Sequence, residues 1–326
     1  MLYIRHSCTD PYFNLAAEEY ILKKFSEDCF MLWRNEPSII VGKHQNTLAE
    51  INLEYVIKNN IKVVRRLSGG GAVFHDPGNL NFTFIVNSED GNLVDFRKFT
   101  EPILEVLRNL GVDAKFEGRN DLTINGAKFS GNAEHVWGKR ILHHGTLLFS
   151  SVMSDLAQAL KVNPLKFQDK SVQSIRSRVT NISVHLKEKM DISTFSDHII
   201  NHIIERFHNV ELYDYTPADL IEINKLKKEK YSLWEWNFGY SPEYRFKKLK
   251  KTKGGNLEIH IDAQKGIIEN IKIYGDFFNR YDIDVVEKKL KGVRHDPEAV
   301  KNSLSELEFS DYFKDIEIDE FILAMF

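Results

Sequence analysis

The segment from Arg65 to Asp76, which reads R-R-L-S-G-G-G-A-V-F-H-D, carries the residue types best suited to binding an anion. Three consecutive glycines let backbone N–H groups converge on a ligand, because no Cβ stands in the way. The arginines supply a fork of donors that matches carboxylate and phosphate geometry. A plain turn is the alternative, but a simple chain reversal seldom needs three glycines. We therefore predict an anion site, whose spacing fits neither the P-loop nor the Rossmann pattern.

A second segment, Gly118 to Gly131, reads G-R-N-D-L-T-I-N-G-A-K-F-S-G and places a lysine just after a tight turn. The dipeptide Asn125-Gly126 favours a two-residue hairpin. Because side chains alternate along a strand, Lys128 is expected on the face opposite to its two neighbours. A lysine on a strand is more often simply solvent-facing, and the segment alone leaves that alternative open.

A third segment contains the adjacent histidines His143 and His144, in H-H-G-T-L-L. Neighbouring residues on a strand point to opposite faces, so the two imidazoles cannot easily bind one ion. The sequence therefore predicts no metal site of the protein's own here.

An arginine–glycine loop together with a strand lysine suits the attack of a carboxylate on the α-phosphate of a nucleotide. Negative charge gathers on phosphate oxygens in that transition state, where backbone N–H groups and a lysine stabilise it. A carboxylate is already a nucleophile, so neither a Ser-His-Asp triad nor a pair of carboxylic acids is required.

In this order and spacing, the three segments resemble those of a two-domain lipoate-protein ligase. The matching stretches are R-R-L-S-G-G-G-A-V-F-H-D-P-G-N-L-N-F-T-F, G-R-N-D-L-T-I-N-G-A-K-F-S-G-N-A, H-H-G-T-L-L and W-E-W-N-F-G-Y-S-P. The resemblance implies an α+β fold, with a large mixed-sheet catalytic domain of the biotin and lipoate ligase type and a small C-terminal α+β accessory domain. In one place, S-G-N-A-E-H, the chain has Glu134 where family members often have Gln, which leaves acyl-chain or acceptor preference open.

The resemblance also implies the site residues. Lys128 is the expected catalytic lysine, in contact with the lipoate carboxylate and the adenylate phosphate, and His144 is expected to shape the pocket. The residues expected to bind substrate or nucleotide are Arg66, Gly70, Gly71, Ala72, Val73, Phe74, His75, Asn79, Asp121, Gly131 and His144. The apolar candidates for the lipoyl slot are Leu15, Phe74, Phe82, Phe84 and Phe129, and a place in the ordinary core is the open alternative for each of them.

The implied reaction has two steps. Lipoate and ATP, with Mg²⁺, give lipoyl-AMP and pyrophosphate. The lipoyl group then passes to a lysine of the lipoyl domains of 2-oxoacid dehydrogenase acyltransferase subunits, or of the glycine-cleavage H protein. The small domain is expected to close as a lid between the steps, and a monomer is expected.

Composition limits the remaining classes of function. The chain has 326 residues, 42% of them hydrophobic, and a formal net charge of -3, so no global basic field points to nucleic acid. Cys8 and Cys29 are the two cysteines, too few for a disulfide framework. No stretch approaches the ~18 apolar residues of a membrane span, and no signal-length run begins the chain. A cytoplasmic location without membrane contact is expected.

Local patterns predict the elements and domains. We expect a helix at 14–25 with Asn14 as its N-cap, paired strands at 72–74 and 80–86, a helix at 99–110 ended by Gly111, and a polar loop at 161–190. The run K-K-L-K-K-T-K-G-G suggests a linker. The expected domains are residues 1–246 (catalytic), 247–255 (linker) and 256–326 (accessory).

Three alternatives remain at this stage. An octanoyl or lipoyl transferase of the same superfamily would need a reactive thiolate, but no cysteine lies in a motif segment. Biotin-protein ligase has an arginine-interleaved glycine loop, unlike the continuous Gly69-Gly70-Gly71. A non-catalytic module that binds lipoyl domains would not need the lysine and the arginine–glycine loop together.

Overall fold

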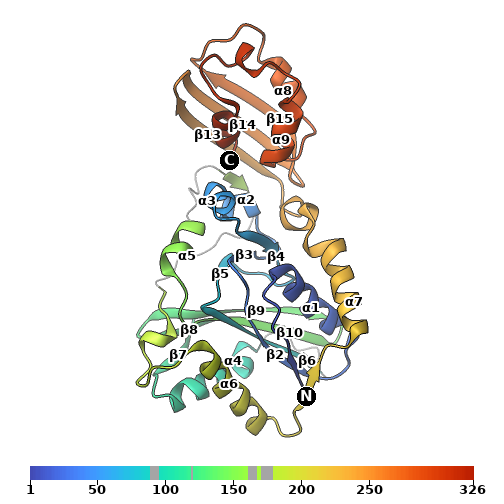
Figure 1. Ribbon diagram of the computed structural model, residues 1–326, viewed down its shortest axis with the longest axis vertical. Helices are drawn as coiled ribbons and strands as arrows, with labels where there is room; N and C mark the ends of the chain where they lie inside the picture. The colour runs from blue at the N-terminus through green and yellow to red at the C-terminus, as the bar shows by residue number, and fades with distance from the viewer. Residues whose placement is uncertain (89–94, 119, 161–166, 170–178) are drawn as a thin grey trace. The chain divides into compact units, whose positions relative to one another are not determined.

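The computed structural model describes residues 1–88, 95–118, 120–160, 167–169 and 179–326, and these residues form two compact units (Figure 1). The large unit comprises Met1–Lys43, Ile61–Ala157 and Ser174–Leu233. The small unit comprises His44–Asn60, Gln158–Gln173 and Trp234–Phe326. The segment 44–60 therefore belongs to the unit that contains the C-terminus, although it lies between two strands of the large unit in sequence.

A mixed sheet, eight-stranded in the described residues, organises the large unit. Its strands in spatial order are β12 (Glu211–Asp214), β1 (Leu2–Arg5), β2 (Cys29–Trp33), β6 (Asn79–Asn87), β10 (Arg140–Leu148), β9 (Ala127–Trp137), β8 (Asp121–Ile124) and β7 (Ala114–Glu117). Strand β1 is parallel to both of its neighbours, and every other neighbouring pair is antiparallel. The mixed sheet and the α+β class agree with the sequence prediction.

Helices cover both faces of this sheet. Helices α4 (Phe96–Asn109) and α6 (Ile192–Arg206) pack on the face that carries Phe82 and Phe84, which forms the main hydrophobic core. Helix α1 (Pro11–Lys24) lies on the other face, where its Glu18 meets Thr83. The remaining helical elements of the large unit are α5 (Met153–Ala159), which ends at the unit boundary, η2 (Ile182–Val184), α7 (Pro217–Leu226) and η3 (Lys227–Tyr231). The alternation of side chains along β6 thus separates an apolar face from a polar one.

A small sheet of β4 (Lys62–Arg65), β3 (Ser38–Val41) and β5 (Val73–His75) carries the glycine segment between β4 and β5. The expected pairing of 72–74 with 80–86 is wrong, because β5 pairs with β3 and β6 pairs with β2 and β10. The intervening turn crosses from one sheet to the other instead of closing a hairpin. Asp76 holds it, accepting from the N–H groups of Gly78 and Val152 at 2.9 and 2.7 Å.

The start of α1 also differs from the prediction. Asp10 caps this helix by accepting from the Tyr12 N–H at 3.3 Å, and proline at the first helical position fixes the backbone there. Asn14 lies inside the helix and is 1% exposed. Its Nδ2 donates to the carbonyl of Cys8 and to Oδ1 of Asn35, so a long-range contact outweighed the capping preference.

The small unit is built on β11 (Phe167–Asp169), β13 (Tyr244–Thr252), β14 (Gly255–Gln264) and β15 (Ile267–Gly275). Its helical elements are α2 (Thr47–Glu50), α3 (Leu53–Lys58), η4 (Glu235–Gly239), α8 (Asp284–Leu290), α9 (Pro297–Leu304), η5 (Phe309–Asp311) and α10 (Ile318–Ala324). The expected linker at 247–255 is wrong, since these residues form the β13–β14 hairpin. Four of the lysines lie on β13 itself, whose buried side chains Tyr244 and Phe246 join the core of this unit. The outer limits of the two domains remain a prediction.

Several local predictions are confirmed. Asn125 and Gly126 join β8 to β9 with φ of +51° and +71°, as their turn type requires. Gly111 follows α4 with φ of +79°. Much of the predicted loop at 161–190 lies outside the described residues. Within the described part of the chain, no helix has the length and apolar character needed to cross a bilayer.

We predict that Gly145→Ala destabilises the large unit. An alanine Cβ at this position would lie 2.2 Å from Asn132 Oδ1 and 2.5 Å from the Phe82 ring, and neither neighbour can move freely inside the sheet. Overpacking of this kind costs about 1–3 kcal/mol in free energy of unfolding, measurable by urea denaturation. Gly69→Ala is the control, because its Cβ would meet nothing within 4 Å. Equal stability of both variants would contradict the prediction.

Candidate active site

The glycine segment is held from inside by Arg66, which is 6% exposed. Its Nε donates to Ser68 Oγ at 3.0 Å, and its NH2 donates to the carbonyls of Gly69 and Gly71 at 2.6 and 2.8 Å. Its NH1 donates to the Ile40 carbonyl on β3 at 3.1 Å. Burial lowers the pKa of the guanidinium to about 10, which leaves it charged at neutral pH. The charge therefore fixes the loop rather than facing outward.

The orientation of the loop follows from these contacts. Because Arg66 draws the carbonyls of Gly69 and Gly71 inward, the N–H groups between them are left for another acceptor. No described residue accepts from the N–H groups of Gly70 or Gly71. Gly70 has φ of +91°, a conformation that side chains disfavour. Backbone donors without protein partners, beside a buried cation, are what an anion site requires.

Arg65 is a second buried brace. Its side chain is fully buried, and its NH1 donates to the carbonyls of Gly42 and Lys43, both at 3.0 Å. The two arginines of the motif thus secure the backbone around the loop through the strand ends.

Lys128 lies on β9, where its neighbours Ala127 and Phe129 are buried on the opposite face, as the alternation predicts. Its Nζ lies 2.8 Å from Asp121 Oδ1, and the two side chains are 26% and 31% exposed. Gly131 sits beneath the lysine, since a Cβ there would meet Nζ at 3.1 Å. The structure thus brings three of the predicted site residues together at one end of the β8–β9 pair.

His144 belongs to a buried chain of hydrogen bonds. Its Nε2 lies 2.6 Å from Ser68 Oγ, and its Nδ1 lies 3.0 Å from Glu18 Oε1. Thr83 Oγ1 also donates to Glu18 Oε1, at 2.7 Å. The sequence analysis missed Glu18 and Ser68. The available signal was the pair Glu18-Glu19 inside an otherwise apolar stretch of α1, where a buried carboxylate needs a partner.

His143 points to the other face of the sheet, as predicted. Its Nδ1 lies 2.9 Å from Glu134 Oε1, its Nε2 lies 3.3 Å from Asn132 Oδ1, and burial lowers its pKa. The two neighbouring histidines therefore have separate carboxylate partners. In the described ranges, no group of three His, Cys, Asp or Glu side chains is arranged to hold a metal ion.

His75 and Asn79 each bury a polar atom that no described residue contacts. The His75 Nδ1 accepts from Asn35 Nδ2 at 3.0 Å, while its Nε2 has no partner in the described chain. Burial, with smaller contributions from Arg66 and His144, lowers the pKa of His75 to about 3. Asn79 donates to Asn81 Oδ1 at 2.9 Å, and its own Oδ1 is unpaired. Arg66 and His144 thus lie close enough to His75 to contribute to the lowering of its pKa.

The other expected residues differ in their surroundings. Ala72, at 8%, and Phe74, at 3%, are buried beside the loop, whereas Val73 is half-buried. Phe82, Phe84 and Phe129 belong to the core under α4 and α6, on the face away from Thr83 and His144. Their expected role in the lipoyl slot therefore loses support, and Leu15 and Phe74, which lie outside that core, remain the candidates.

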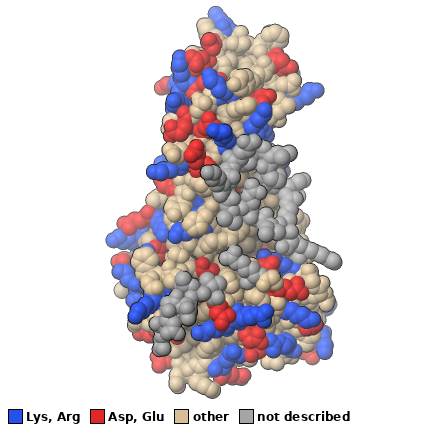
Figure 2. Space-filling view, turned by 180° about the vertical axis from the view of Figure 1, so that it is seen from behind, with Lys and Arg blue, Asp and Glu red and all other residues tan. Residues whose placement is uncertain are grey.

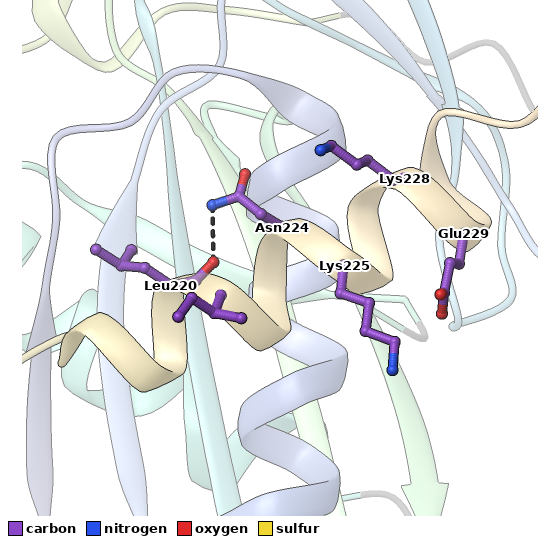
Figure 3. Close-up of a pocket in the computed structure, with 6 residues that line it drawn as sticks. Leu220, Asn224, Lys225, Lys228 and Glu229 are labelled. Carbon is purple, nitrogen blue, oxygen red and sulfur yellow. Dashed lines mark hydrogen bonds between the residues drawn. The ribbon is translucent and has the colours of Figure 1, made fainter.

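A surface hollow of about 630 Å³ lies along α7 and η3, but it contains none of the expected site residues (Figure 3). Its lining residues are Leu220, Ile221, Asn224, Lys225, Lys228 and Glu229. On the face drawn in Figure 2, the coloured residues show Lys and Arg interspersed with Asp and Glu. Since the hollow contains none of the expected site residues, the candidate catalytic and binding residues remain those of the glycine loop, β9 and β10.

Comparison with known proteins identifies the family. Residues 10–204 match the lipoyl protein ligase A/B catalytic domain, and residues 241–325 match the bacterial lipoate protein ligase C-terminus. The chain belongs to the lipoate-protein ligase family. It is 44% identical to lipoate–protein ligase 1 of Staphylococcus aureus over 98% of both chains. It is 42% identical to lipoate-protein ligase LplJ of Bacillus subtilis over 99% of both. These findings confirm the lipoate-protein ligase activity expected from the motifs.

Solved structures of lipoate-protein ligases agree with this assignment. A putative lipoate protein ligase from Thermoplasma acidophilum with bound lipoic acid is 26% identical, with a TM-score of 0.64 over 73% of this chain and 98% of that chain. Lipoate-protein ligase A bound with ATP is also 26% identical, with a TM-score of 0.62 over 73% of this chain and 98% of that chain. A structure of a bi-partite lipoate protein ligase and its E2 lipoyl domain from Thermoplasma acidophilum matches with a TM-score of 0.62 and 27% identity, over 73% of this chain and 96% of that chain.

We predict that Gly131→Ala reduces ligase activity with little effect on stability. The new Cβ would lie 3.1 Å from both Cε and Nζ of Lys128, so the end of the lysine would shift. Misplacement of a reacting group by a fraction of an ångström to an ångström lowers rates by roughly 10- to 100-fold. The measurement is lipoylation of an acceptor domain by mass spectrometry, alongside the thermal unfolding midpoint. Full activity, or a large fall in the midpoint, would contradict this prediction.

Proposed function

We propose that the protein activates lipoate with ATP through the glycine loop and Lys128, and then transfers the lipoyl group to a lysine of an acceptor protein. Two observations carry this proposal: the Gly70 and Gly71 N–H groups have no acceptor among the described residues, and the same unit holds Lys128, whose Nζ contacts Asp121 beside Gly131. The loop N–H groups carry partial positive charge and the Lys128 ammonium a full one, and each suits contact with phosphate oxygens. Family relatives with bound lipoic acid and bound ATP support the two substrates.

In the first step, a carboxylate oxygen of lipoate attacks the α-phosphorus of ATP. A new phosphorus–oxygen bond forms, the bond to the pyrophosphate oxygen breaks, and pyrophosphate leaves with the electron pair. Lys128 exchanges its contact with Asp121 for the lipoate carboxylate and the α-phosphate, and the loop N–H groups stabilise the negative charge. The residues proposed to line the nucleotide and acyl-adenylate are Arg66, Gly70, Gly71, Ala72, Val73, Phe74, His75, Asn79, Asp121, Gly131 and His144.

In the second step, the amine of the acceptor lysine attacks the acyl carbonyl of lipoyl-AMP. An amide bond forms, the amine loses a proton to solvent, and AMP leaves with the electrons of the acyl–oxygen bond. Lys128 again stabilises the departing phosphate. The proposed acceptors are lipoyl domains of 2-oxoacid dehydrogenase acyltransferase subunits and glycine-cleavage H protein, a choice supported by the Thermoplasma pair of ligase and E2 lipoyl domain.

Mg²⁺ is proposed to enter with ATP. The nucleotide phosphates would supply most of its ligands, and Asp121, whose Oδ1 lies 2.8 Å from Lys128 Nζ, would be able to add a carboxylate oxygen. Mg²⁺ bound there would neutralise phosphate charge as pyrophosphate leaves.

We further propose a cytoplasmic location, because ATP is an intracellular substrate. We also propose that the protein is a monomer and that residues 256–326 act as a lid. The inclusion of residues 44–60 in the small unit suggests that a moving lid would carry them too.

We predict that Lys128→Ala abolishes both lipoyl-AMP formation and acceptor lipoylation, because it removes the one charge proposed to contact the carboxylate and the phosphate. The expected loss is ~100-fold or more in the rate of pyrophosphate release with lipoate, ATP and Mg²⁺. Lys115→Ala is the matched control, since Lys115 forms an exposed surface pair with Asp113. Addition of EDTA should stop the wild-type reaction, and excess Mg²⁺ should restore it.

The outcomes separate the remaining alternatives. Pyrophosphate release without acceptor modification would support activation and reject the acceptor that was tested. No pyrophosphate release by the wild type would reject the proposed mechanism and favour a transferase or a non-catalytic binding module. Loss of activity in Lys115→Ala as well would show that the assay responds to general charge rather than to Lys128.

We predict that the double variant Cys8→Ser, Cys29→Ser retains ligase activity within about twofold of the wild type. Burial raises the pKa of the Cys29 thiol to about 12, and the residue is 1% exposed, so it cannot act as an accessible thiolate at neutral pH. The readout is acceptor lipoylation, with thermal unfolding as the control for folding. Loss of acyl transfer in a stably folded double variant would revive the thioester mechanism.

A further inference from the structure

We infer that Glu18 and His144 are positioning residues, which act through Ser68 and Arg66 to set the conformation of the glycine loop. This inference rests on the proposed function of the loop. The evidence is a continuous set of buried contacts from the sheet to the loop, all within the large unit. In order, these contacts join Trp33, Thr83, Glu18, His144, Ser68, Arg66 and the carbonyls of Gly69 and Gly71.

Glu18 connects the strands of the sheet to His144 in this chain of contacts. Its side chain is buried at 2% exposure, where an unpaired carboxylate would be very costly. It accepts from Thr83 Oγ1 at 2.7 Å and from His144 Nδ1 at 3.0 and 3.1 Å. Trp33 Nε1 in turn donates to Thr83 Oγ1 at 2.9 Å. Trp33 on β2 thus holds Thr83 on β6, and Thr83 holds the Glu18 carboxylate. The carboxylate in turn orients the imidazole ring of His144.

Ser68 joins this fixed pair to the loop. Since the carboxylate of Glu18 only accepts, His144 Nδ1 donates in that contact, and in the neutral imidazole Nε2 accepts from the Ser68 hydroxyl at 2.6 Å. Ser68 Oγ at the same time accepts from Arg66 Nε at 3.0 Å. One side of the guanidinium is thus held by the serine while its NH2 holds Gly69 and Gly71. Ser68 therefore sets the plane of the guanidinium, and with it the direction of the Gly70 and Gly71 N–H groups, together with the Gly69 carbonyl, which also accepts from Nε at 3.2 Å, and the Ile40 carbonyl.

The order Glu18, His144, Ser68 resembles the carboxylate, imidazole and hydroxyl of a hydrolase, but its burial argues against nucleophilic chemistry. Ser68 is 1% exposed, and its oxygen already accepts from a cation while its proton is used toward His144. A nucleophilic serine needs access to an acyl carbonyl and an oxygen lone pair directed at it. Glu18, His144 and Ser68 therefore position Arg66 and the loop and do not form a nucleophile.

The same strand provides a matched control. His143 pairs with Glu134 at 2.9 Å, close to the 3.0 Å between His144 and Glu18, and both carboxylates belong to side chains with about 3% exposure. The His143 pair lies on the opposite face, where the other contacts of His143 in the described residues are Asn132 and the rings of Phe82, Phe96 and Phe99, none of which belongs to the loop. Glu134→Gln therefore removes a buried carboxylate that contacts a histidine between β9 and β10, without touching the chain of contacts from Glu18 to Arg66.

The experiment compares Glu18→Gln, Ser68→Ala, their double variant and Glu134→Gln in the full-length protein. The readouts are kcat for pyrophosphate release, KM for lipoate, and the thermal unfolding midpoint. We expect Glu18→Gln and Ser68→Ala each to lower kcat by roughly 10- to 100-fold, while KM for lipoate changes less than about threefold. The double variant should be no slower than the slower single variant, because both changes break one chain of contacts. Glu134→Gln should retain the wild-type kcat.

Multiplicative losses in the double variant would overturn the inference, since Glu18 and Ser68 would then act independently. A rise in KM for lipoate with kcat retained would also overturn it, because the residues would only line the acyl pocket. An equal loss of kcat in Glu134→Gln would overturn it as well, because the effect would then come from general destabilisation. By contrast, a wild type that releases no pyrophosphate would overturn the proposed function itself, and the inference with it.

Discussion

The buried guanidinium of Arg66 is the interaction on which the site depends. A buried cation requires a full set of acceptors, and here they are Ser68 Oγ and the carbonyls of Ile40, Gly69 and Gly71. Hydrogen bonds from an ionised donor are stronger than neutral ones, so the loop can keep Gly70 in a positive-φ conformation. Gly42 is part of the same arrangement, because a Cβ there would lie 2.0 Å from the Gly70 carbonyl oxygen.

The alternation of side chains along β6 and β10 then determines which residues can reach this loop. Phe82, Phe84 and His143 face the core under α4, whereas Thr83 and His144 face α1 and its Glu18. A shift of one residue in register would exchange the two sets. The core that stabilises the sheet therefore also fixes the polar face on which the loop is anchored, so stability and site geometry are set by the same strand pairing.

The features that the sequence predicted correctly have local causes. Asn125-Gly126 specifies a turn through its own backbone preferences, and the opposite orientation of His143 and His144 follows from the pleat. The errors involve partners far along the chain. Asn14 satisfies Asn35 instead of capping its helix, residues 247–255 pair with β14, and Glu18 acquires a role only when α1 packs across β6 and β10. The resemblance named the residues of the proposed site because its motif segments come from distant parts of the chain, but none of those segments lies in α1, so Glu18 was missed.

The two cations of the proposed site, Arg66 and Lys128, differ in how firmly they are held, and this difference suits a two-step reaction. Arg66 is buried and cannot leave its carbonyls without exposing several unpaired groups. Lys128 is partly exposed, and its pair with Asp121 is of the kind worth only about 0–1 kcal/mol. It can therefore exchange Asp121 for a carboxylate or phosphate at small cost and return after AMP leaves. In the proposed mechanism, a fixed charge that shapes the backbone and an exchangeable charge that follows the phosphate would together give activation and transfer without a covalent enzyme intermediate, which is consistent with the burial of Cys29.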